Sequence, residues 1–283
     1  MVALDGTPVN AIRGVIERIT RLTIDRSPRQ IIAAWDTEWR PQWRVDLIPT
    51  YKTHRTESVD DGISDDSESL MPDNLASQIP ILEEVLQALG IPVIGHEMYE
   101  ADDIIGTYAH NSIGPIEIVT GDRDLFQLVD DKKKIMVLYT GKGEIQQVNE
   151  QHIIDKYGIS PNQYVDYAIL RGDPSDGLPG VRAIGEKTAS NLIQEFGDIE
   201  KIFKAALKND PRIKPRIREN ILASKDYLTA AAKVVPVVKD IELPLEDSLN
   251  FSMAPKSIID SLAQELNLKT TFSKILHSFS LKG

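Results

Sequence analysis

The sequence contains no cysteine, and this absence excludes two classes of site. Without thiols the chain can form neither disulfides nor thiolate-ligated metal centres, so any metal must be held by oxygen or imidazole ligands. Long apolar runs are absent too, because none approaches the roughly 20 residues that a membrane-spanning helix needs. The first ten residues show neither the basic segment nor the apolar core of a secretory signal. We therefore expect a soluble, cytoplasmic protein that does not bind membranes.

Positive charge is scarce overall, since the formal net charge is −11. An acidic total argues against a nucleic-acid binder, which contacts phosphates through Lys and Arg. The distribution of the charge weakens that argument. Residues 13–55 carry nine bases against five acids and residues 182–233 carry eleven against seven, whereas residues 57–131 carry 18 acids and one base, Arg123. Two basic segments thus flank a carboxylate-rich middle, whose charge bound divalent cations would partly cancel.

Short apolar runs alternate with helical patterns in the first half of the chain. The runs at 30–36, 91–96 and 116–122 indicate buried strands, and apolar residues recur at helical spacing in 10–24, 74–89 and 100–111. This alternation predicts an α/β domain with a mainly parallel sheet covered by helices. After about residue 158 helical patterns replace the strand signals and predict a second lobe, followed by an extended segment at 235–243 and helical turns at 257–276.

Acidic residues gather at the ends of predicted strands and the starts of predicted helices, the edge where sites of parallel sheets are found. Carboxylate ligands suit Mg²⁺ or Mn²⁺, and two such ions can activate a water and stabilise a leaving oxygen. Taken singly, each cluster has another explanation, because acids complement helix starts and Asp-Gly pairs form turns. Their convergence favours a metal site. The clusters are Asp36, then Glu100, Asp102 and Asp103, then Asp122 and Asp124, and finally Asp173 and Asp176.

Four motifs in order contain most of these acids: MYEADDIIGTYA, IVTGDRDLFQLV, LRGDPSDGLPGV and IGEKTASNLIQEFG. They resemble the 5′ nuclease domain of bacterial DNA polymerase I and the related stand-alone 5′-3′ exonucleases and flap endonucleases. The similarity extends from about Thr7 to the C-terminal segment. The resemblance implies a PIN-like parallel-sheet domain with a helix-three-turn-helix lobe, and it assigns metal binding to the same eight carboxylates. It also implies two or more Mg²⁺ or Mn²⁺ ions.

The resemblance implies a domain division and a biological setting as well. The catalytic domain is expected at 1–157, with a flexible acidic arch loop at about 56–71, the DNA-binding lobe at 158–243 and a C-terminal segment that packs on the body at 244–283. The expected substrates are DNA flaps, nicks and branches in replication and repair. We expect a monomer in the bacterial nucleoid, acting in one pathway with a DNA polymerase or ligase, and a chain without a polymerase domain of its own.

The stretch WRVDLIPTYKTHR is similar to the part of the family that leads into the arch over the active site. By this match Arg44, Lys52 and Arg55 supply positive charge beside the developing phosphorane. Tyr51 could stack on an exposed base near the cut. For Trp35, Trp39 and Trp43 we expect core packing instead.

The stretch LPGVRAIGEKTASNLIQEFG resembles the hairpin that grips duplex DNA in this family, often with a bound monovalent cation such as K⁺. Small residues allow backbone amides to approach phosphates, and a helix N-terminus favours an anion. Such contacts read the backbone of DNA rather than its bases. The match assigns DNA binding to Gly180, Val181, Ile184, Gly185, Lys187 and Thr188.

The N-terminus departs from the family, whose members begin with an apolar strand that ends in Asp-Gly. Here TPVNAIRGV follows VALDG at once, so Asp5 matches a loop aspartate and not the first metal ligand. We therefore expect the central N-terminal strand to be missing, with neighbouring strands left unpaired. Two alternatives to an active flap nuclease stay open: an impaired module that binds branched DNA, and a PIN-like ribonuclease.

Overall fold

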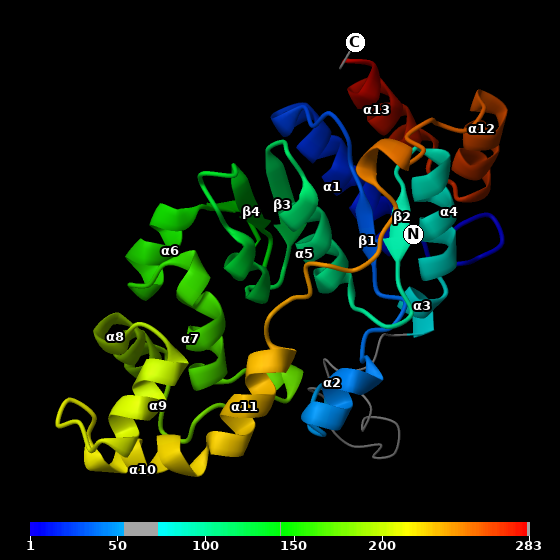
Figure 1. Cartoon of the computed structure of the whole chain (residues 1–283). Coiled ribbons are helices and arrows are strands. Elements are labelled where there is room, and N and C mark those ends of the chain that lie inside the picture. Colours follow the sequence, from blue (N-terminus) through cyan, green and yellow to red (C-terminus); the bar gives the residue numbers. More distant parts are fainter. Residues whose placement is uncertain (54–72, 142, 282–283) are drawn as a thin grey trace. The chain divides into compact units, whose positions relative to one another are not determined.

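The computed structural model describes residues 1–53, 73–141 and 143–281 (Figure 1). The chain divides into two compact units, each built from segments that are distant in the sequence. The first comprises Met1–Trp35, Asp65–Ile94 and Pro244–Gly283, and the second comprises Asp36–Ser64 and Gly95–Leu243. Arg55 and the loop predicted at 56–71 lie outside the described residues. No helix in the described ranges is long and apolar enough to cross a membrane.

The first unit packs helices around a two-stranded sheet. Ala33 in β1 donates its N–H to the carbonyl of Pro92, just before β2 (2.9 Å). One hydrophobic core joins helices from both ends of the chain, because Ile12, Leu86 and Phe272 are each at most 2% exposed and belong to it. The elements are α1 (Asn10–Arg26), β1 (Ala33–Trp35), α3 (Asp73–Ala76), α4 (Ile79–Ala88), β2 (Val93–Gly95), α12 (Lys256–Glu265) and α13 (Lys269–Ser280).

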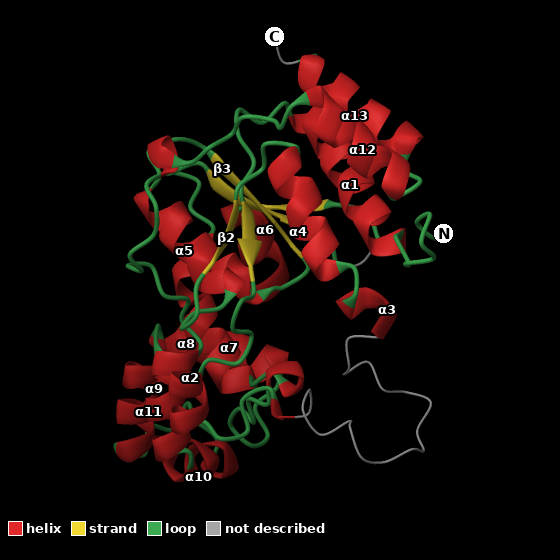
Figure 2. Cartoon of the chain, turned by 90° about the vertical axis from the view of Figure 1, so that its right-hand side faces the viewer, coloured by secondary structure: helices red, strands yellow, loops and turns green. Residues whose placement is uncertain are grey.

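The second unit contains a three-stranded sheet and a helical part without strands (Figure 2). In the sheet β3 and β4 run parallel, with Ile116 opposite Ile135, and β5 pairs antiparallel with β4. The elements before the helical part are α2 (Gln42–Leu47), α5 (Ala101–Asn111), β3 (Ile116–Thr120), η3 (Asp124–Leu128), β4 (Ile135–Tyr139) and β5 (Gln146–Val148). The helices that follow are α6 (Glu150–Tyr157), η4 (Pro161–Gln163), α7 (Tyr164–Arg171), η5 (Pro174–Asp176), α8 (Glu186–Phe196), α9 (Ile199–Leu207), α10 (Pro215–Ala223) and α11 (Lys225–Val234).

The predicted α/β architecture is confirmed, with differences in the sheet. All three predicted strands form, but each is shorter than its apolar run. The strands β4 and β5 were not predicted, although the first and last residues of β4, Ile135 and Tyr139, are both buried. In the described residues the strands form two sheets, of which one includes an antiparallel pair. The helix predicted over 74–89 is interrupted between α3 and α4.

Candidate active site

Two carboxylates bind backbone groups at the beginning of α5. Glu100 precedes the helix in an extended conformation, and Asp103 Oδ2 accepts the N–H of Glu100 (3.1 Å). From another segment, Asp36 Oδ1 accepts the N–H of Ala101 (2.7 Å). These contacts pair amide groups that the first turn of a helix leaves without partners. They also fix the backbone on both sides of Asp102, which lies between Ala101 and Asp103 in the sequence.

Behind this helix start lies a buried ion pair between α2 and α5. Arg44 donates to both oxygens of Asp103 at 2.7 Å each, and the two residues are 2% and 0% exposed. Arg44 also donates to Glu100 Oε2 (3.1 Å) and to the carbonyl of Val234 (3.2 Å). A buried guanidinium with these partners disfavours the predicted contact of Arg44 with the substrate. Asp103 is likewise a structural partner, and its Oδ1 also accepts the N–H of Val238 (2.8 Å).

Tyr51 and Lys52 both turn inward onto Glu100. The Tyr51 hydroxyl donates to Glu100 Oε2 (2.9 Å) and Lys52 Nζ donates to Glu100 Oε1 (2.7 Å). Burial raises the pKa of Glu100, and the charges of Lys52 and Arg44 oppose that shift. The Tyr51 side chain is 4% exposed and bound to Glu100, which disfavours the predicted stacking on an exposed base. Trp39, expected in the core, is 37% exposed instead.

The remaining acids lie in two tight turns. Asp122 follows β3, and its Oδ1 accepts the N–H of Asp124 (2.7 Å) at the start of η3. Asp173 precedes η5, and its Oδ1 accepts the N–H of Ser175 (3.0 Å). Asp176 ends that short helix. Side-chain bonds of this kind stabilise turns, and here they fix each pair of carboxylates relative to its own backbone.

Two raised pKa values indicate that these acids lie close enough to repel one another. The pKa of Asp102 is raised to about 8, first by burial and then by the charges of Asp122, Glu100 and Asp36. The pKa of Asp124 is also raised, again first by burial and then by Asp122, Asp176 and Asp173. Seven of the eight predicted carboxylates are therefore linked through Asp102 or Asp124, whereas Asp103 binds Arg44. Among the described residues no three Asp, Glu or His side chains form a ready-made metal site.

A close backbone contact joins the turn at Asp176 to the segment after α2. Lys52 donates its N–H to the carbonyl of Asp176 (2.9 Å), and Thr50 Oγ1 donates to the carbonyl of Gly177 (2.8 Å). Gly177 has a φ of +67°, and a Cβ there would lie 1.8 Å from the carbonyl oxygen of Thr50. Only glycine fits, because the position needs both left-handed backbone and space.

We expect Gly177→Ala to destabilise the fold by about 2 kcal/mol or more, because backbone must move to admit the methyl group. Thermal unfolding measures this. The control is Gly14→Ala inside α1, where no atom lies within 4 Å of the added Cβ. That variant should be neutral or stabilising by up to about 1 kcal/mol. Equal unfolding temperatures for the two variants would contradict the close contact.

The predicted DNA-binding hairpin is only partly available for contacts with a ligand. Gly185 and Lys187 are exposed at the start of α8, and Thr188 is half-buried. Val181 and Ile184 are 2% and 4% exposed, and their N–H groups donate to Leu170 and Val181. Their side chains and amides are thus used inside the fold, which disfavours the predicted contact of these two residues with DNA.

Two arginines that sequence reasoning did not assign to the site lie beside the acids. Arg171 Nη2 donates to Asp173 Oδ2 (2.9 Å), and the charge of Arg171 opposes the raised pKa of Asp124. Arg123 stands between Asp122 and Asp124 in the sequence. The signal was present in the motifs RGD and DRD, in which each arginine is close in sequence to a candidate ligand.

Comparison with known proteins now places this site in a family. Residues 1–158 match the 5′-3′ exonuclease N-terminal resolvase-like domain, and residues 159–257 match the 5′-3′ exonuclease C-terminal SAM fold. The chain belongs to the 5′-3′ exonuclease family. A 5′-3′ exonuclease of Streptomyces coelicolor is 49% identical over 244 residues, 86% of this chain and 80% of that protein. This family membership confirms an enzyme that hydrolyses phosphodiester bonds.

A longer relative agrees with this membership, and two solved structures share the fold. DNA polymerase I of Mycobacterium bovis is 32% identical over 284 residues, 98% of this chain and 29% of that protein. The T5 5′-exonuclease with bound zinc has a TM-score of 0.65 at 17% identity, covering 96% of this chain and 93% of that one. A T5 flap endonuclease variant with DNA and metal ions has a TM-score of 0.63 at 17% identity, covering 94% and 90%. The PIN-like fold with a helical lobe is thereby confirmed.

Proposed function

We propose that this member of the 5′-3′ exonuclease family is a structure-specific nuclease that removes nucleotides from 5′ ends and cuts 5′ flaps in branched or nicked DNA. The observation that carries the proposal is the cluster of Asp102, Asp122, Asp124, Asp173 and Asp176, which three separate segments contribute. The T5 flap endonuclease, similar in fold, was solved with DNA and metal ions. That neighbour supports the same two ligands here.

The acidic cluster fits divalent cations by its chemistry. All its donors are carboxylate oxygens, and burial together with mutual repulsion raises the pKa of Asp102 and Asp124. A cation between them would offset this repulsion, and oxygen ligands favour Mg²⁺ or Mn²⁺. When bound, two such ions activate a water and stabilise the leaving oxygen of a phosphodiester. We propose as ligands Asp36, Asp102, Asp122, Asp124, Asp173 and Asp176.

Glu100, Asp103 and Arg44 have a different role in this proposal, which is to hold the start of α5. Glu100 accepts bonds from Tyr51, Lys52 and Arg44, so its oxygens are already occupied by protein donors. Lys52 is 7% exposed and brings a positive charge next to the carboxylates. Arg55 stays a predicted substrate contact outside the described residues.

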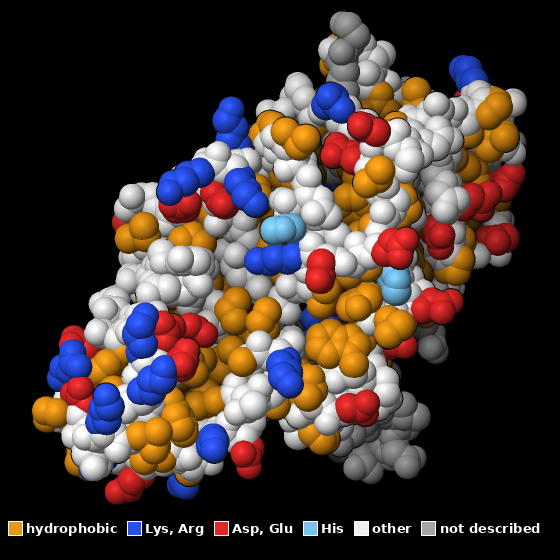
Figure 3. All heavy atoms as spheres, viewed as in Figure 1, with side chains coloured by type: hydrophobic (Ala, Val, Ile, Leu, Met, Phe, Trp, Pro, Cys, Tyr) orange, Lys and Arg blue, Asp and Glu red, His pale blue; other side chains and the backbone are white. Residues whose placement is uncertain are grey.

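The helical lobe supplies the grip on duplex DNA in this proposal. Gly180, Gly185, Lys187 and Thr188 remain as candidate contacts at the hairpin, with K⁺ as a candidate monovalent ion. Figure 3 shows Lys and Arg side chains over α8 to α10, interleaved with Asp and Glu. This surface offers positive charge to phosphates at several separate points, and it is not one uniform basic patch. We retain the domain division at 1–157, 158–243 and 244–283 as part of the proposal.

The cellular setting follows from the substrate. A polymerase that displaces a strand leaves a 5′ flap, and removal of this flap leaves a nick that a ligase can seal. We propose that the protein acts as a cytoplasmic monomer in DNA replication and repair, in one pathway with such enzymes.

The raised pKa values predict how metal and pH act together on stability. A carboxyl group whose pKa is raised by folding binds protons more tightly in the native state, so the metal-free protein should lose stability as pH rises from about 4 to about 8. The loss should amount to a few kcal/mol, since one pKa unit corresponds to about 1.4 kcal/mol. Mg²⁺ or Mn²⁺ should restore more stability at pH 8 than at pH 5.5, because protons compete with the metal.

Unfolding temperatures in EDTA and in Mn²⁺ across this pH range test the prediction. Asp102→Asn should flatten the EDTA profile, because the amide cannot ionise. A metal effect that is equal at both pH values would contradict the assignment of Asp102.

The proposed function is tested by incubating the chain with a 5′-labelled flap DNA in Mn²⁺ or Mg²⁺. We expect cleavage near the junction and none in EDTA. Binding without cleavage in either metal would instead favour a module that holds branched DNA. Faster cleavage of the matching RNA would favour the ribonuclease alternative.

A further inference from the structure

Two arginines beside the acidic cluster share one carboxylate without a hydrogen bond to it. Arg123 Nη1 lies 3.6 Å from Glu186 Oε1, and Arg171 Nη1 lies 3.9 Å from the same atom. Both distances exceed the ~2.7–2.9 Å of a charge-assisted N–H···O bond. The Glu186 side chain is 62% exposed, so it can rotate into solvent at little cost. The Glu186 carboxylate therefore lies near both guanidinium groups but forms no hydrogen bond with either of them.

Arg171 is held rigidly and still has an unused donor. Its Nε donates to the carbonyl of Gly172 and its Nη2 to Asp173 Oδ2, both at 2.9 Å. The side chain is 9% exposed, and Nη1 has no hydrogen-bond acceptor among the residues that the structure describes. Burying a donor without an acceptor is unfavourable, because the group loses its hydrogen bonds to water. An anion that reaches Nη1 would remove that cost.

The carboxylate that both arginines approach belongs to the first residue of α8. Glu186 is the first residue of this 11-residue helix, and the preceding Gly185 has no side chain to cap it. The first N–H groups of a helix lack intrahelical acceptors and attract anions together with the helix dipole. Two guanidinium groups and a helix N-terminus thus meet at the Glu186 carboxylate.

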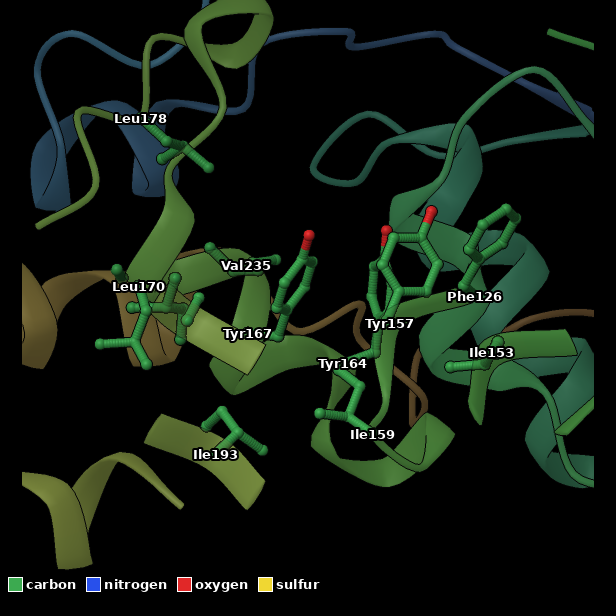
Figure 4. Packing of buried hydrophobic residues seen from close by; sticks show 14 of the residues in the cluster. Phe126, Ile153, Tyr157, Ile159, Tyr164, Tyr167, Leu170, Leu178, Ile193 and Val235 are labelled. Atoms are coloured by element: carbon green, nitrogen blue, oxygen red, sulfur yellow. The ribbon is translucent and has the colours of Figure 1, made fainter. Parts of the chain in front are cut away.

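Arg171 packs against a cluster of tyrosines, whose side chains are drawn in Figure 4. The rings of Tyr157, Tyr164 and Tyr167 lie 5.4 to 5.5 Å apart, and the Arg171 guanidinium lies 5.5 Å from the Tyr167 ring centre. Their three hydroxyl groups point to the same side, away from Ile159 and Ile193. Two of these hydroxyls interact with the arginines, that of Tyr157 with Arg123 and that of Tyr167 with Arg171. The tyrosine side chains pack against Arg171, and they carry no carboxylate that would neutralise its positive charge.

We propose that Arg123, Arg171 and the amino end of α8 form a subsite for a phosphate group of bound DNA, which the Glu186 carboxylate occupies until DNA displaces it. The subsite lies next to the acidic cluster, because Arg171 binds Asp173 and Arg123 adjoins Asp124 in the sequence. It rests on the proposed function, since it needs DNA at this site. It would hold the strand beside the cleavage site by its phosphate, independently of base sequence.

Binding of a fluorescent flap DNA in EDTA, at several salt concentrations, tests the subsite without cleavage. For Arg123→Gln we expect affinity to fall about 3- to 10-fold and the slope of log Kd against log salt to shrink by about 1, the effect of one lost phosphate contact. For Glu186→Gln we expect affinity to rise several-fold, because the neutral amide competes less for the arginines.

Matched controls come from an exposed pair in α1, where Arg21 Nε lies 3.5 Å from Asp25 Oδ2. Arg21→Gln and Asp25→Asn make the same changes of net charge far from α8 in the sequence. If Arg123→Gln and Glu186→Gln shift binding no more than these controls, while the parent binds and cuts flap DNA, the subsite is overturned and the nuclease proposal stands. A parent chain that neither binds nor cuts would overturn both.

A second comparison identifies which phosphate is bound. Nicked DNA with a 5′-phosphate and the same DNA with a 5′-hydroxyl are measured with the parent and with Arg123→Gln. A loss confined to the phosphorylated DNA would assign the subsite to the terminal phosphate. An equal loss on both would assign it to a phosphodiester within the strand, and no loss on either would contradict the proposal.

Discussion

Asp124→Asn is expected to lower flap cleavage on the order of 10³-fold while leaving the metal-free protein at least as stable as the parent. Activity falls because a central member of the acidic cluster loses its charge and one oxygen donor. Stability does not fall, because burial and the neighbouring Asp122, Asp176 and Asp173 make ionisation of Asp124 unfavourable in the fold. The N–H of residue 124 can still donate to Asp122 Oδ1. Opposite effects on activity and stability mark a residue that serves chemistry at the expense of the fold.

Single-turnover cleavage in Mn²⁺ and thermal unfolding in EDTA measure the two effects on the same preparation. Asp155→Asn is the matched control, because Asp155 is an exposed residue of α6 that accepts a bond from Gln151. The control should cut like the parent. An Asp124→Asn variant that cuts within threefold of the parent would remove Asp124 from the site. One that unfolds well below the parent in EDTA would show that repulsion does not dominate there.

Arg44→Met is expected to destabilise the protein by about 3–5 kcal/mol, the range found when one partner of a buried ion pair is removed. The loss leaves Asp103, which is fully buried, as a carboxylate without its cation. Glu100 loses one of its two cationic partners as well. Because both acids hold the start of α5, we also expect weaker metal binding through Asp102.

Denaturant unfolding measures the cost, and two comparisons separate its causes. Arg13→Met removes the cation of an exposed pair with Glu17, 44% exposed on both sides, and should cost less than about 1 kcal/mol. The double variant Arg44→Met with Asp103→Asn should cost less than the sum of the single changes, because a neutral amide tolerates burial better than a lone carboxylate. Additive costs would mean that the two side chains do not depend on each other.

Local patterns in the sequence were enough to place the candidate carboxylates. Asp122 could be placed after a strand and Asp102 in the first turn of a helix, because apolar periodicity is a property of neighbouring residues. The four motifs added the family and its α/β fold with a helical lobe. The strands β4 and β5 escaped prediction, since a short apolar run is ambiguous until its partner strand is known.

Only the tertiary structure decided which polar side chains are free to meet a ligand. Arg44 and Tyr51 have the residue types and motif positions of substrate contacts, but they are buried because Val234, far along the chain, and Glu100 bind them. Val181 and Ile184 were removed from the DNA-binding surface in the same way, by packing inside the second unit. Burial depends on which distant segments pack together, and no local window of sequence contains that information.

The same division applies to Arg123, Arg171 and Glu186. The sequence by itself determined their types and their spacing to the acids, and it set the helix that begins at Glu186. The fold decided that the two arginines share one carboxylate and that one of them keeps an unused donor. The physical reason is that hydrogen bonds act over about 3 Å, so their pattern depends on three-dimensional placement, whereas strands and helices follow from the periodicity of the chain.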